Sequence, residues 1–540
     1  MSQALEVRRV SATDARTTVR DADALAMLID TTTCIGCKAC EVACVEWNDL
    51  KVEPEYGERM LHSFQTMPDM TPAFWNLIKF NELPVDAQRR PAPDPVVSGP
   101  NFMSPVFAAG EAASDGGIML LMRKDMCLHC AEPGCLVACP AEGAIVQYTN
   151  GIVDFQQEHC IGCGYCMTGC PFNVPKFDPV SKRVFKCTMC SDRLENGLGP
   201  ACVKACPTGC LEFGTKKEMA LRAEHRAIQV KAEGFPQAGV YDPPGVGGTG
   251  VIYVLHHADR PELYGELPKE PKIDPQIAFW KGPLKPIGGI LFGLSLAAAA
   301  VHYFKAGPRR EKLHAEKAGQ REIVRYTVFE RVLHWTVAFT FLYLALTGLG
   351  LFTPKMAWLL DVLGGGQVAR AWHPIVGVVF VGAVLVQFGK WFKDLLLTPN
   401  DRVWLKKMRD YVAGRDEHVP PTGRFNAGQK MLFWTQVAMG LVLLASGIPI
   451  WFPEEFSRSL RLWSIVVHSA SAVVAILSLV VHIHMSVFIS RGALRAMTEG
   501  KVTEEWARHH HGAWAEEQLR PRAPGPGSQP PGPEPLRPEA

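Results

Sequence analysis

Four runs of closely spaced cysteines constrain the first half of this chain more than any other feature. In one run, Cys160, Cys163, Cys166 and Cys170 follow a C-x2-C-x2-C-x3-C spacing, and Pro171 follows the last cysteine. With this spacing, three thiolates hold one iron–sulfur cluster and the fourth binds the other cluster of a pair. Three variants of the run occur elsewhere, so the sequence predicts four [4Fe-4S] clusters. The predicted ligands are Cys34, Cys37, Cys40, Cys44, Cys127, Cys130, Cys135, Cys139, Cys160, Cys163, Cys166, Cys170, Cys187, Cys190, Cys202 and Cys206.

The order of the runs predicts how they pair. The second and third runs are adjacent in the chain, so we expect them to share one pair of clusters and the first and last runs to share the other. Paired C-x2-C zinc sites are the alternative, but zinc needs neither a third cysteine at i+6 nor a proline after the fourth. Cys210 is left over, and we expect it to be a small buried residue instead of a ligand.

The second half of the chain contains five long apolar segments. Each is long enough to cross a hydrocarbon core of about 30 Å as a helix. A buried core helix is the alternative for any one segment, but five in series favour a membrane protein. The net charge of +2 hides this division, because it averages a polar, cysteine-rich half with an apolar one. The segments are residues 286–304, 329–352, 373–392, 431–452 and 464–489.

Lysines and arginines predict the orientation of these segments. They are concentrated after the first segment, between the third and fourth, and at the start of the tail, whereas each of the other two loops carries two. Such an excess marks the cytoplasmic side. We therefore expect a multi-pass inner-membrane protein with the cysteine domain in the periplasm and the C-terminus in the cytoplasm. The first thirty residues lack the apolar stretch of a signal peptide, so we expect another protein to direct export.

Histidines in the apolar segments give further candidate metal ligands, because an ionisable residue inside a membrane helix is a functional candidate by default. His468 and His482 are 14 residues apart, which places them within about 40° on one helix face and about 21 Å apart along its axis. His373 and His334 lie at the matching levels of other segments. The sequence therefore predicts two b-type haems, the outer bound by His373 and His468 and the inner by His334 and His482. For any single histidine, a hydrogen-bonded or interfacial role is the alternative.

Other polar features of the sequence are expected to have structural roles. His484 lies about 200° around the helix from His482 and is the weaker ligand candidate. His302 ends the first apolar segment and is expected at the membrane interface, and residues 509–511 are histidines in a polar tail that we expect to be solvated. A G-x-G-x-x-G string at residues 245–250 precedes a strand-like run instead of following one, so we interpret it as a turn.

Two sets of stretches outside these patterns resemble a known family. The first 305 residues resemble the iron–sulfur (beta) subunit of the respiratory, quinone-linked formate dehydrogenase N/O family, and residues 322–515 resemble its cytochrome b (gamma) subunit. Beyond the cysteine runs, the first resemblance is carried by Glu46-Trp-Asn-Asp49, Pro207-Thr-Gly209, Gly214-Thr-Lys-Lys-Glu-Met219, His256-His-Ala-Asp259 and Trp280-Lys-Gly282. The second is carried by Glu330-Arg-Val-Leu-His-Trp335, His373-Pro374, Phe425-Asn-Ala-Gly-Gln-Lys430 and Gly500-Lys-Val502.

The resemblance implies an α+β multi-domain chain with tandem ferredoxin-like [4Fe-4S] modules, one anchor transmembrane helix and a four-helix transmembrane cytochrome b bundle. The chain departs from the family in three ways. Two subunits are joined in one chain, residues 63–117 form a longer insertion than the family leads us to expect, and Cys210 stands where the family has a small aliphatic residue. The expected divisions are a polar arm at 1–25, an iron–sulfur domain at 26–280 with an insertion at 63–117, the anchor helix at 281–305, a basic cytoplasmic linker at 306–328, the cytochrome b domain at 329–492, and a cytoplasmic tail at 493–540 with a Pro-rich end.

The resemblance also implies partners and a direction of electron flow. A separate periplasmic catalytic (alpha) subunit would hold molybdenum or tungsten with a pterin cofactor, and we assign no catalytic residue for formate oxidation to this chain. Electrons would pass through four clusters and two haems to menaquinone or ubiquinone near the cytoplasmic face. By motif, the quinone pocket falls on Asn426, Gly428 and Gln429, next to His482; capping of the fourth helix is the alternative role. The family suggests a trimer of the complex, in contact with lipid and with no nucleic acid.

Two alternatives to this function remain open at the level of the sequence. The same cofactors would equally serve another catalytic partner, such as a membrane-bound hydrogenase. A membrane scaffold or assembly protein with purely structural clusters is a third interpretation. The substrate that reduces the haems separates the first two, and redox-inert clusters or absent haem would favour the third.

Overall fold

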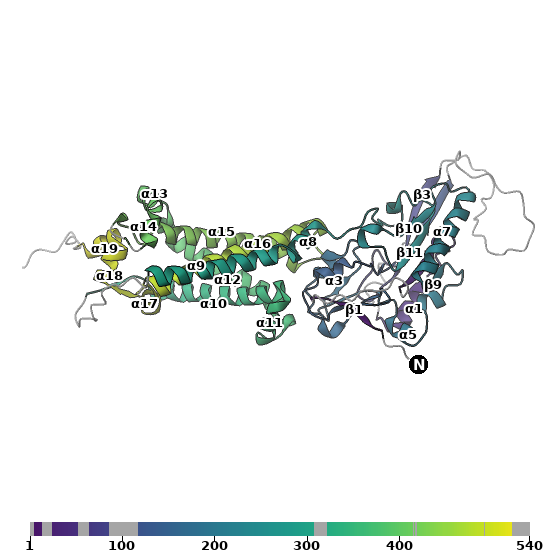
Figure 1. Ribbon diagram of the computed structural model, residues 1–540, viewed down its shortest axis with the longest axis horizontal. Coiled ribbons are helices and arrows are strands. Elements are labelled where there is room, and N and C mark those ends of the chain that lie inside the picture. Colours follow the sequence, from purple (N-terminus) through teal and green to yellow (C-terminus); the bar gives the residue numbers. More distant parts are fainter. Residues whose placement is uncertain are drawn as a thin grey trace, which may run out of the picture. The chain divides into compact units, whose positions relative to one another are not determined.

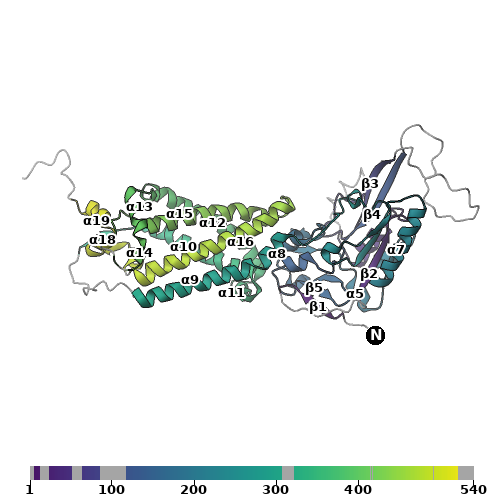
Figure 2. The same cartoon turned by 45° about the horizontal axis from the view of Figure 1, so that its top comes forward.

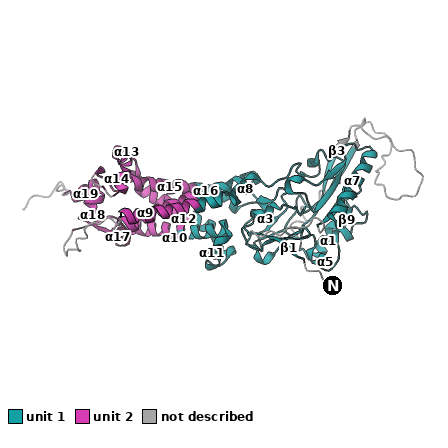
Figure 3. Cartoon of the chain, viewed as in Figure 1, with its two compact units in different colours: residues 1–289, 342–377, 442–471 teal, residues 290–341, 378–441, 472–540 magenta. Residues whose placement is uncertain are grey.

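A computed structural model describes residues 5–12, 24–51, 64–85, 117–306, 321–413, 415, 418–490 and 492–520. The chain forms two compact units (Figure 3). The first unit comprises residues 1–289, 342–377 and 442–471, and the second comprises residues 290–341, 378–441 and 472–540. The five long apolar helices described below each contribute residues to both units.

A four-stranded sheet forms one part of the first unit. Its strand order is β10-β11-β2-β9, and only the β11–β2 pair is parallel. Helix α7 packs on this sheet through Met219, Ala223 and Ala227, which recur on one helix face and contact Ala26 and Ile252 (Figure 1). The bounds are Leu25–Asp30 for β2, Leu211–Thr215 for β9, Lys216–Ala232 for α7, Gly239–Tyr241 for β10 and Val251–Leu255 for β11.

The cysteine runs fold into short helices joined by tight loops. Residues inside the loops adopt left-handed backbone conformations, with φ of 64° at Lys38 and 67° at Gly162. Gly162 has a second constraint, because a Cβ atom there would overlap the carbonyl oxygen of Lys182. A glycine at this position therefore lets the loop turn sharply enough for successive cysteines to face one point. The helices are α1 (Ala39–Trp47), α3 (Gly134–Ala138), α4 (Tyr165–Gly169), α5 (Ser191–Glu195) and α6 (Ala201–Lys204).

Smaller sheets complete the first unit. Strand β1 lies in the predicted polar arm and pairs with β5, which also pairs with β6. Strand β3 lies in the predicted insertion and forms a hairpin with β4, which Figure 2 shows; residues 86–116 between them lie outside the described residues. The bounds are Val7–Val10 (β1), Leu77–Val85 (β3), Gly117–Asp125 (β4), Ile145–Tyr148 (β5), Val153–Phe155 (β6), Lys176–Asp178 (β7) and Arg183–Phe185 (β8). Short 3-10 turns lie at Gln157–His159, Pro244–Val246, Pro261–Leu263 and Pro354–Met356.

Within the described residues, five helices are long and apolar enough to cross a membrane, which confirms the five predicted apolar segments. The third begins at Gly366, although the sequence placed its start at His373. The predicted bounds followed the apolar residues alone, whereas the helix also includes the more polar turns before His373, and Pro374 lies inside it. The helices are α9 (Leu284–Ala306), α10 (Val328–Phe352), α12 (Gly366–Leu395), α15 (Ala427–Trp451) and α16 (Arg458–Ile483), which continues as a π-helix over His484–Ile489.

The second unit contains a small folded tail. Trp506 and Trp514 of the tail share an aromatic core with Trp391 of α12. His511 is buried and bonds to Arg325, 2.9 Å away, so the expectation that this histidine is solvated is wrong. The tail folds back because its tryptophans bury apolar surface that a solvated tail would leave in water. The remaining elements are α8 (Pro275–Lys281), β12 (Glu322–Val324), α11 (Trp358–Val362), α13 (Pro399–Lys406), α14 (Met408–Val412), α17 (Ala493–Thr498), β13 (Lys501–Thr503), α18 (Glu504–His510) and α19 (Gly512–Leu519).

Candidate redox centres

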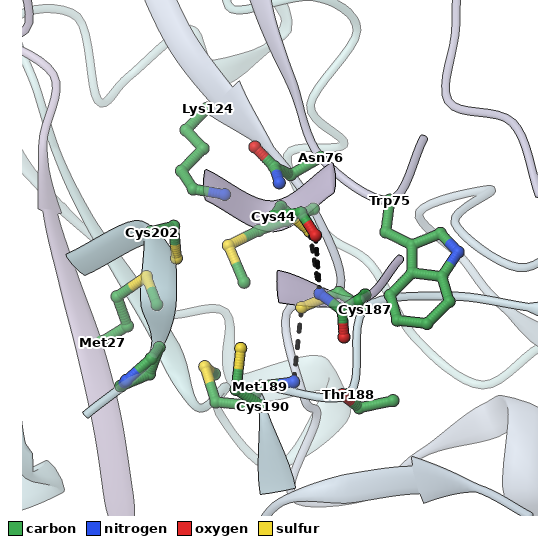
Figure 4. Close-up of a pocket in the computed structure, with 13 residues that line it drawn as sticks. Met27, Cys44, Trp75, Asn76, Lys124, Cys187, Thr188, Met189, Cys190 and Cys202 are labelled. Atoms are coloured by element: carbon green, nitrogen blue, oxygen red, sulfur yellow. Dashed lines mark hydrogen bonds between the residues drawn. The ribbon is translucent and has the colours of Figure 1, made fainter. Parts of the chain in front are cut away.

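The first cavity is lined by four cysteines from two distant runs: Cys44, Cys187, Cys190 and Cys202. Cys44 lies on α1, Cys190 directly precedes α5, and Cys202 lies on α6. Figure 4 shows the cysteine side chains around this cavity, which we call the Cys44 cavity. The backbone N–H of Met189 donates to the sulfur of Cys187 over 3.4 Å, a contact typical of sulfur that ligates an iron–sulfur cluster.

A second cavity is lined by the other four cysteines of the same two runs: Cys34, Cys37, Cys40 and Cys206. We call it the Cys206 cavity. In both cavities, three cysteines come from one run and the fourth comes from the other. The predicted pairing of the first and last runs in space is therefore confirmed.

The second and third runs also exchange their fourth cysteines. In each of two groups, burial raises the pKa of one thiol well above its ordinary value, and the three other thiols of the group raise it further. The packing of α3 on α4 agrees with this proximity of the thiols, since a Cβ atom at Gly134 would overlap the carbonyl oxygen of Gly169. The first group is Cys127, Cys130, Cys135 and Cys170, and the second is Cys139, Cys160, Cys163 and Cys166.

These sites suit a cluster better than a single ion. Among the described residues, no group of three or more Cys, His, Asp or Glu side chains converges closely enough to hold one metal ion. An iron–sulfur cube spreads its four thiolates around a larger core, as the cavity walls do here. Burial raises the pKa of Cys40, Cys163 and Cys190 to about 12, so these thiols would be protonated without a metal to hold the thiolate. The donor set therefore fits [4Fe-4S] clusters.

Cys210 is buried, as expected, but it lies in the wall of the Cys206 cavity. Its sulfur is 3.4 Å from the sulfur of Cys206. A hydrogen bond with Cys210 is the main cause that lowers the pKa of Cys34 below its ordinary value. The cysteine spacing gave no sign of this position, because Cys210 follows the last run and reaches the cavity only through the turn before β9.

The four predicted haem ligands form two pairs, which we call the outer pair (His373 and His468) and the inner pair (His334 and His482). The ring centroids are 6.3 Å apart in both, with interplanar angles of 56° in the outer pair and 54° in the inner pair. Metal–imidazole bonds are about 2.0 Å long, and a ring centre lies about 1.1 Å behind its nitrogen, so an iron between two rings would separate their centroids by roughly 6.2 Å. The spacing of both pairs therefore fits bis-histidine ligation.

Hydrogen bonds set the tautomers of the outer pair. The Thr347 hydroxyl donates to the carbonyl of Tyr343 over 2.7 Å, so its oxygen accepts the Nδ1–H of His373, also over 2.7 Å. His468 Nδ1 lies 3.1 Å from the Leu443 carbonyl, which can only accept. Both rings thus carry their proton on Nδ1, which leaves the Nε2 lone pair for a metal.

The third cysteine run contacts the helices that carry the outer pair. At the start of α12, the Gln367 amide donates to the carbonyl of Cys160 over 3.2 Å. At the start of α16, Arg458 donates to the carbonyl of Thr168 over 3.0 Å and forms an ion pair with Asp274. These bonds lie within the first unit. They join the third cysteine run to the first turns of the two helices that carry the outer pair.

The predicted quinone residues lie at the start of α15. The Asn426 side-chain oxygen accepts the backbone N–H of Gln429 over 2.9 Å, and the Gln429 side-chain oxygen accepts the backbone N–H of Asn426 over 3.0 Å. This reciprocal pair is a capping box, so the alternative role of these residues is confirmed. A Cβ atom at Gly428 would lie 3.2 Å from the indole of Trp404, so a larger residue would displace that ring.

His302 and His484 form a pair that the sequence did not predict. Nδ1 of His302 lies 2.8 Å from Nε2 of His484, and its Nε2 lies 2.8 Å from the carbonyl oxygen of Val412. His302 was expected at the membrane interface, and His484 was the weaker ligand candidate. The pairing follows from the π-helix after Ile483, whose wider turn redirects His484.

Comparisons with known families match most of the chain. Residues 118–216 match a 4Fe-4S dicluster domain, residues 273–316 match the transmembrane segment of formate dehydrogenase N, and residues 325–500 match prokaryotic cytochrome b561. The matches agree with an iron–sulfur domain followed by a helical membrane region of the cytochrome b type.

Curated relatives fall into two groups. The nitrate-inducible formate dehydrogenase iron–sulfur subunit of Escherichia coli K12 is 48% identical over 294 residues, which cover 54% of this chain and 89% of the relative. The formate dehydrogenase-O iron–sulfur subunit of the same organism is 44% identical over 329 residues, covering 59% of this chain and 99% of the relative. The cytochrome b556(fdo) subunit of formate dehydrogenase from E. coli K12 is 39% identical over 198 residues, covering 36% of this chain and 92% of the relative.

Proposed function

Because the chain belongs to the formate dehydrogenase family, as an iron–sulfur subunit and a cytochrome b subunit joined in one polypeptide, we propose that it carries electrons from a formate-oxidising catalytic subunit to quinone. Four [4Fe-4S] clusters and two b haems would supply the one-electron chemistry. The sixteen predicted cysteines would hold the clusters, and the outer and inner histidine pairs would hold the haems. The observation that carries this proposal is the contact of the third cysteine run with both helices of the outer pair.

The contacts of the third run support an electron exit from the iron–sulfur domain at this run. Gln367 and Arg458 fix the loop that carries Cys160 against the first turns of α12 and α16. His373 is seven residues after the start of α12, and His468 is ten residues after the start of α16. The cluster site of Cys139, Cys160, Cys163 and Cys166 is therefore the proposed donor to the outer pair.

The membrane arrangement is part of the same proposal. Helix α9 would be a single anchor, and α10, α12, α15 and α16 would form the four-helix cytochrome b bundle. The excess of lysine and arginine after α9, between α12 and α15 and after α16 supports a cytoplasmic location of these segments. The iron–sulfur domain would then lie in the periplasm beside the molybdenum- or tungsten-containing partner, and a trimer of the complex follows from the family resemblance.

The quinone would be reduced near the inner pair at the cytoplasmic side. The capping box uses the side-chain oxygens of Asn426 and Gln429, and each amide also has N–H groups that can donate to a quinone oxygen. Reduction there would take up cytoplasmic protons, while formate oxidation outside would release protons. The complex would thus build a proton-motive force by separating the two half-reactions.

Metal and haem analysis of the purified complex tests the cofactor assignment. We expect two b haems per copy of this chain, and about 16 iron atoms and about 16 sulfides bound by its cysteines. His468→Ala should remove one haem and keep the other, since His334 and its partner remain. Zinc in place of iron and sulfide, or two haems retained in the variant, would contradict the assignment.

A further inference from the structure

Lys124 is a buried lysine of the first unit. It lies on β4 opposite Ile78 of β3, and its side chain is 2% exposed. The hydroxyl of Tyr253 donates to the backbone carbonyl of Lys124 over 2.8 Å and fixes β4 at this point. Among the described residues, its ammonium nitrogen finds no hydrogen-bond partner. A buried charge is tolerated when an anion pairs with it, so the surroundings of Lys124 should contain one.

The lysine lines both cavities of the first and last cysteine runs. It lies beside Cys44 and Cys202 in one cavity and beside Cys40 and Cys206 in the other. Figure 4 shows its side chain at the Cys44 cavity, on the side of Cys44 and Cys202. Cys40 and Cys44 are one turn apart on α1, so the two cavities meet along this helix. One ammonium therefore faces two cluster sites.

Two other buried charged groups differ from Lys124, because among the described residues each has hydrogen-bond partners and the Lys124 ammonium has none. Glu41 is a buried carboxylate on α1, but its oxygens accept hydrogen bonds from Thr66 and from the backbone of Ile78. Lys186 is another buried lysine near cysteine thiols, but its ammonium donates to the carbonyls of Val153 and Cys187. In the part of the chain that the structure describes, the Lys124 ammonium donates to neither a carboxylate nor a carbonyl, so the two cavities that it lines are where a hydrogen-bonding anion would lie.

We propose that Lys124 is a positioning residue shared by the two clusters of the first and last runs, where its ammonium hydrogen-bonds to cluster sulfur and raises both reduction potentials. The proposal rests on the cluster assignment made above. A four-thiolate cluster is anionic and becomes more so on reduction, so a fixed positive charge stabilises the reduced form. The clusters of the second and third runs lie in other cysteine groups and should not share this effect.

Redox titration monitored by electron paramagnetic resonance tests the proposal on the complete complex. Lys124→Met should lower the reduction potentials of the two clusters of the first and last runs. The expected change is at least tenfold in the equilibrium constant for reduction, which is about 59 mV for a one-electron couple. The potentials of the clusters of the second and third runs should not change. Lys124→Arg keeps the charge and should shift them less. Lys217→Met, at an exposed position of α7, makes the same change in net charge and should shift none. Four unchanged potentials in a fully assembled Lys124→Met variant would overturn the proposal.

A second measurement needs no loss of the lysine charge, in case Lys124→Met fails to assemble. Lysine labelled with nitrogen-15 in the otherwise unmodified complex should give a hyperfine coupling to reduced clusters, and the coupling should persist in Lys186→Arg. Absence of any lysine coupling would overturn the inference. If the unmodified complex contains no iron–sulfur clusters, the proposed function fails first; if the clusters are present without lysine coupling, only this inference fails.

Discussion

The hydrogen bond between Thr347 and His373 allows a sharp test of the haem assignment. Thr347→Val keeps the shape of the side chain and removes the oxygen that accepts the Nδ1–H of His373. The bond donates electron density to the ring and so stabilises the ferric iron that the ring would bind. A neutral hydrogen bond contributes about 1 kcal/mol, which corresponds to roughly 40 mV for a one-electron couple. We therefore expect the potential of the outer haem to rise by roughly this amount.

An optical redox titration of the b-haem bands measures this shift. The inner haem should keep its potential, because neither of its ligands contacts Thr347 among the described residues. Thr340→Val is the matched control, since its hydroxyl lies on the same helix and donates to the backbone carbonyls of Thr336 and Val337. Equal potentials in the two variants, or a shift of both haems together in Thr347→Val, would refute the argument.

Substitutions at three further positions test other parts of the account. Gly162→Ala should remove about four iron atoms per chain, because the added Cβ would overlap the carbonyl oxygen of Lys182. Gly151→Ala is the control, since Gly151 also has a left-handed backbone, with φ of 88°, but has open space around it. Iron analysis of the two variants therefore separates the effect of the overlap from that of backbone strain. Cys210→Ala should keep the full iron and sulfide content, and a loss of one cluster would make this thiol a ligand. Asn426→Ser should keep the helix cap, since serine caps helices nearly as well as asparagine. Asn426→Ala should lower the free energy of unfolding, measured by thermal unfolding, by about 1 kcal/mol. Slower quinone reduction by a stable Asn426→Ser variant would support the quinone role, and unchanged turnover would leave only the cap.

Local patterns predicted the features that depend on spacing alone. The cysteine runs gave the exchange of fourth cysteines between paired runs, which the Cys44 and Cys206 cavities reproduce. The match of His373 with His468 and of His334 with His482 came from helix geometry, and both pairs are observed at the same separation. These features follow from short-range backbone rules, which a sequence displays directly.

Features that depend on long-range packing were not predictable in this way. Lys124 is one of three consecutive charged residues that end an apolar strand, and only the folded chain places it in the walls of two cavities. His511 sits in a polar stretch, and its burial depends on Arg325, 186 residues away in the chain. The first residue of α12, Gly366, lies so close to Ile161 in the third cysteine run that a Cβ on the glycine would overlap that side chain. Each case requires a partner that is distant in sequence.

The central claim is that electrons from formate pass through this chain to quinone. The most direct test is to purify the membrane complex anaerobically with its native partner, add formate, and follow the b-haem absorption bands. The account predicts rapid reduction of both haems, which an added quinone analogue then reverses. Haems that stay oxidised with formate but are reduced by hydrogen would contradict the account and assign the chain to another catalytic partner.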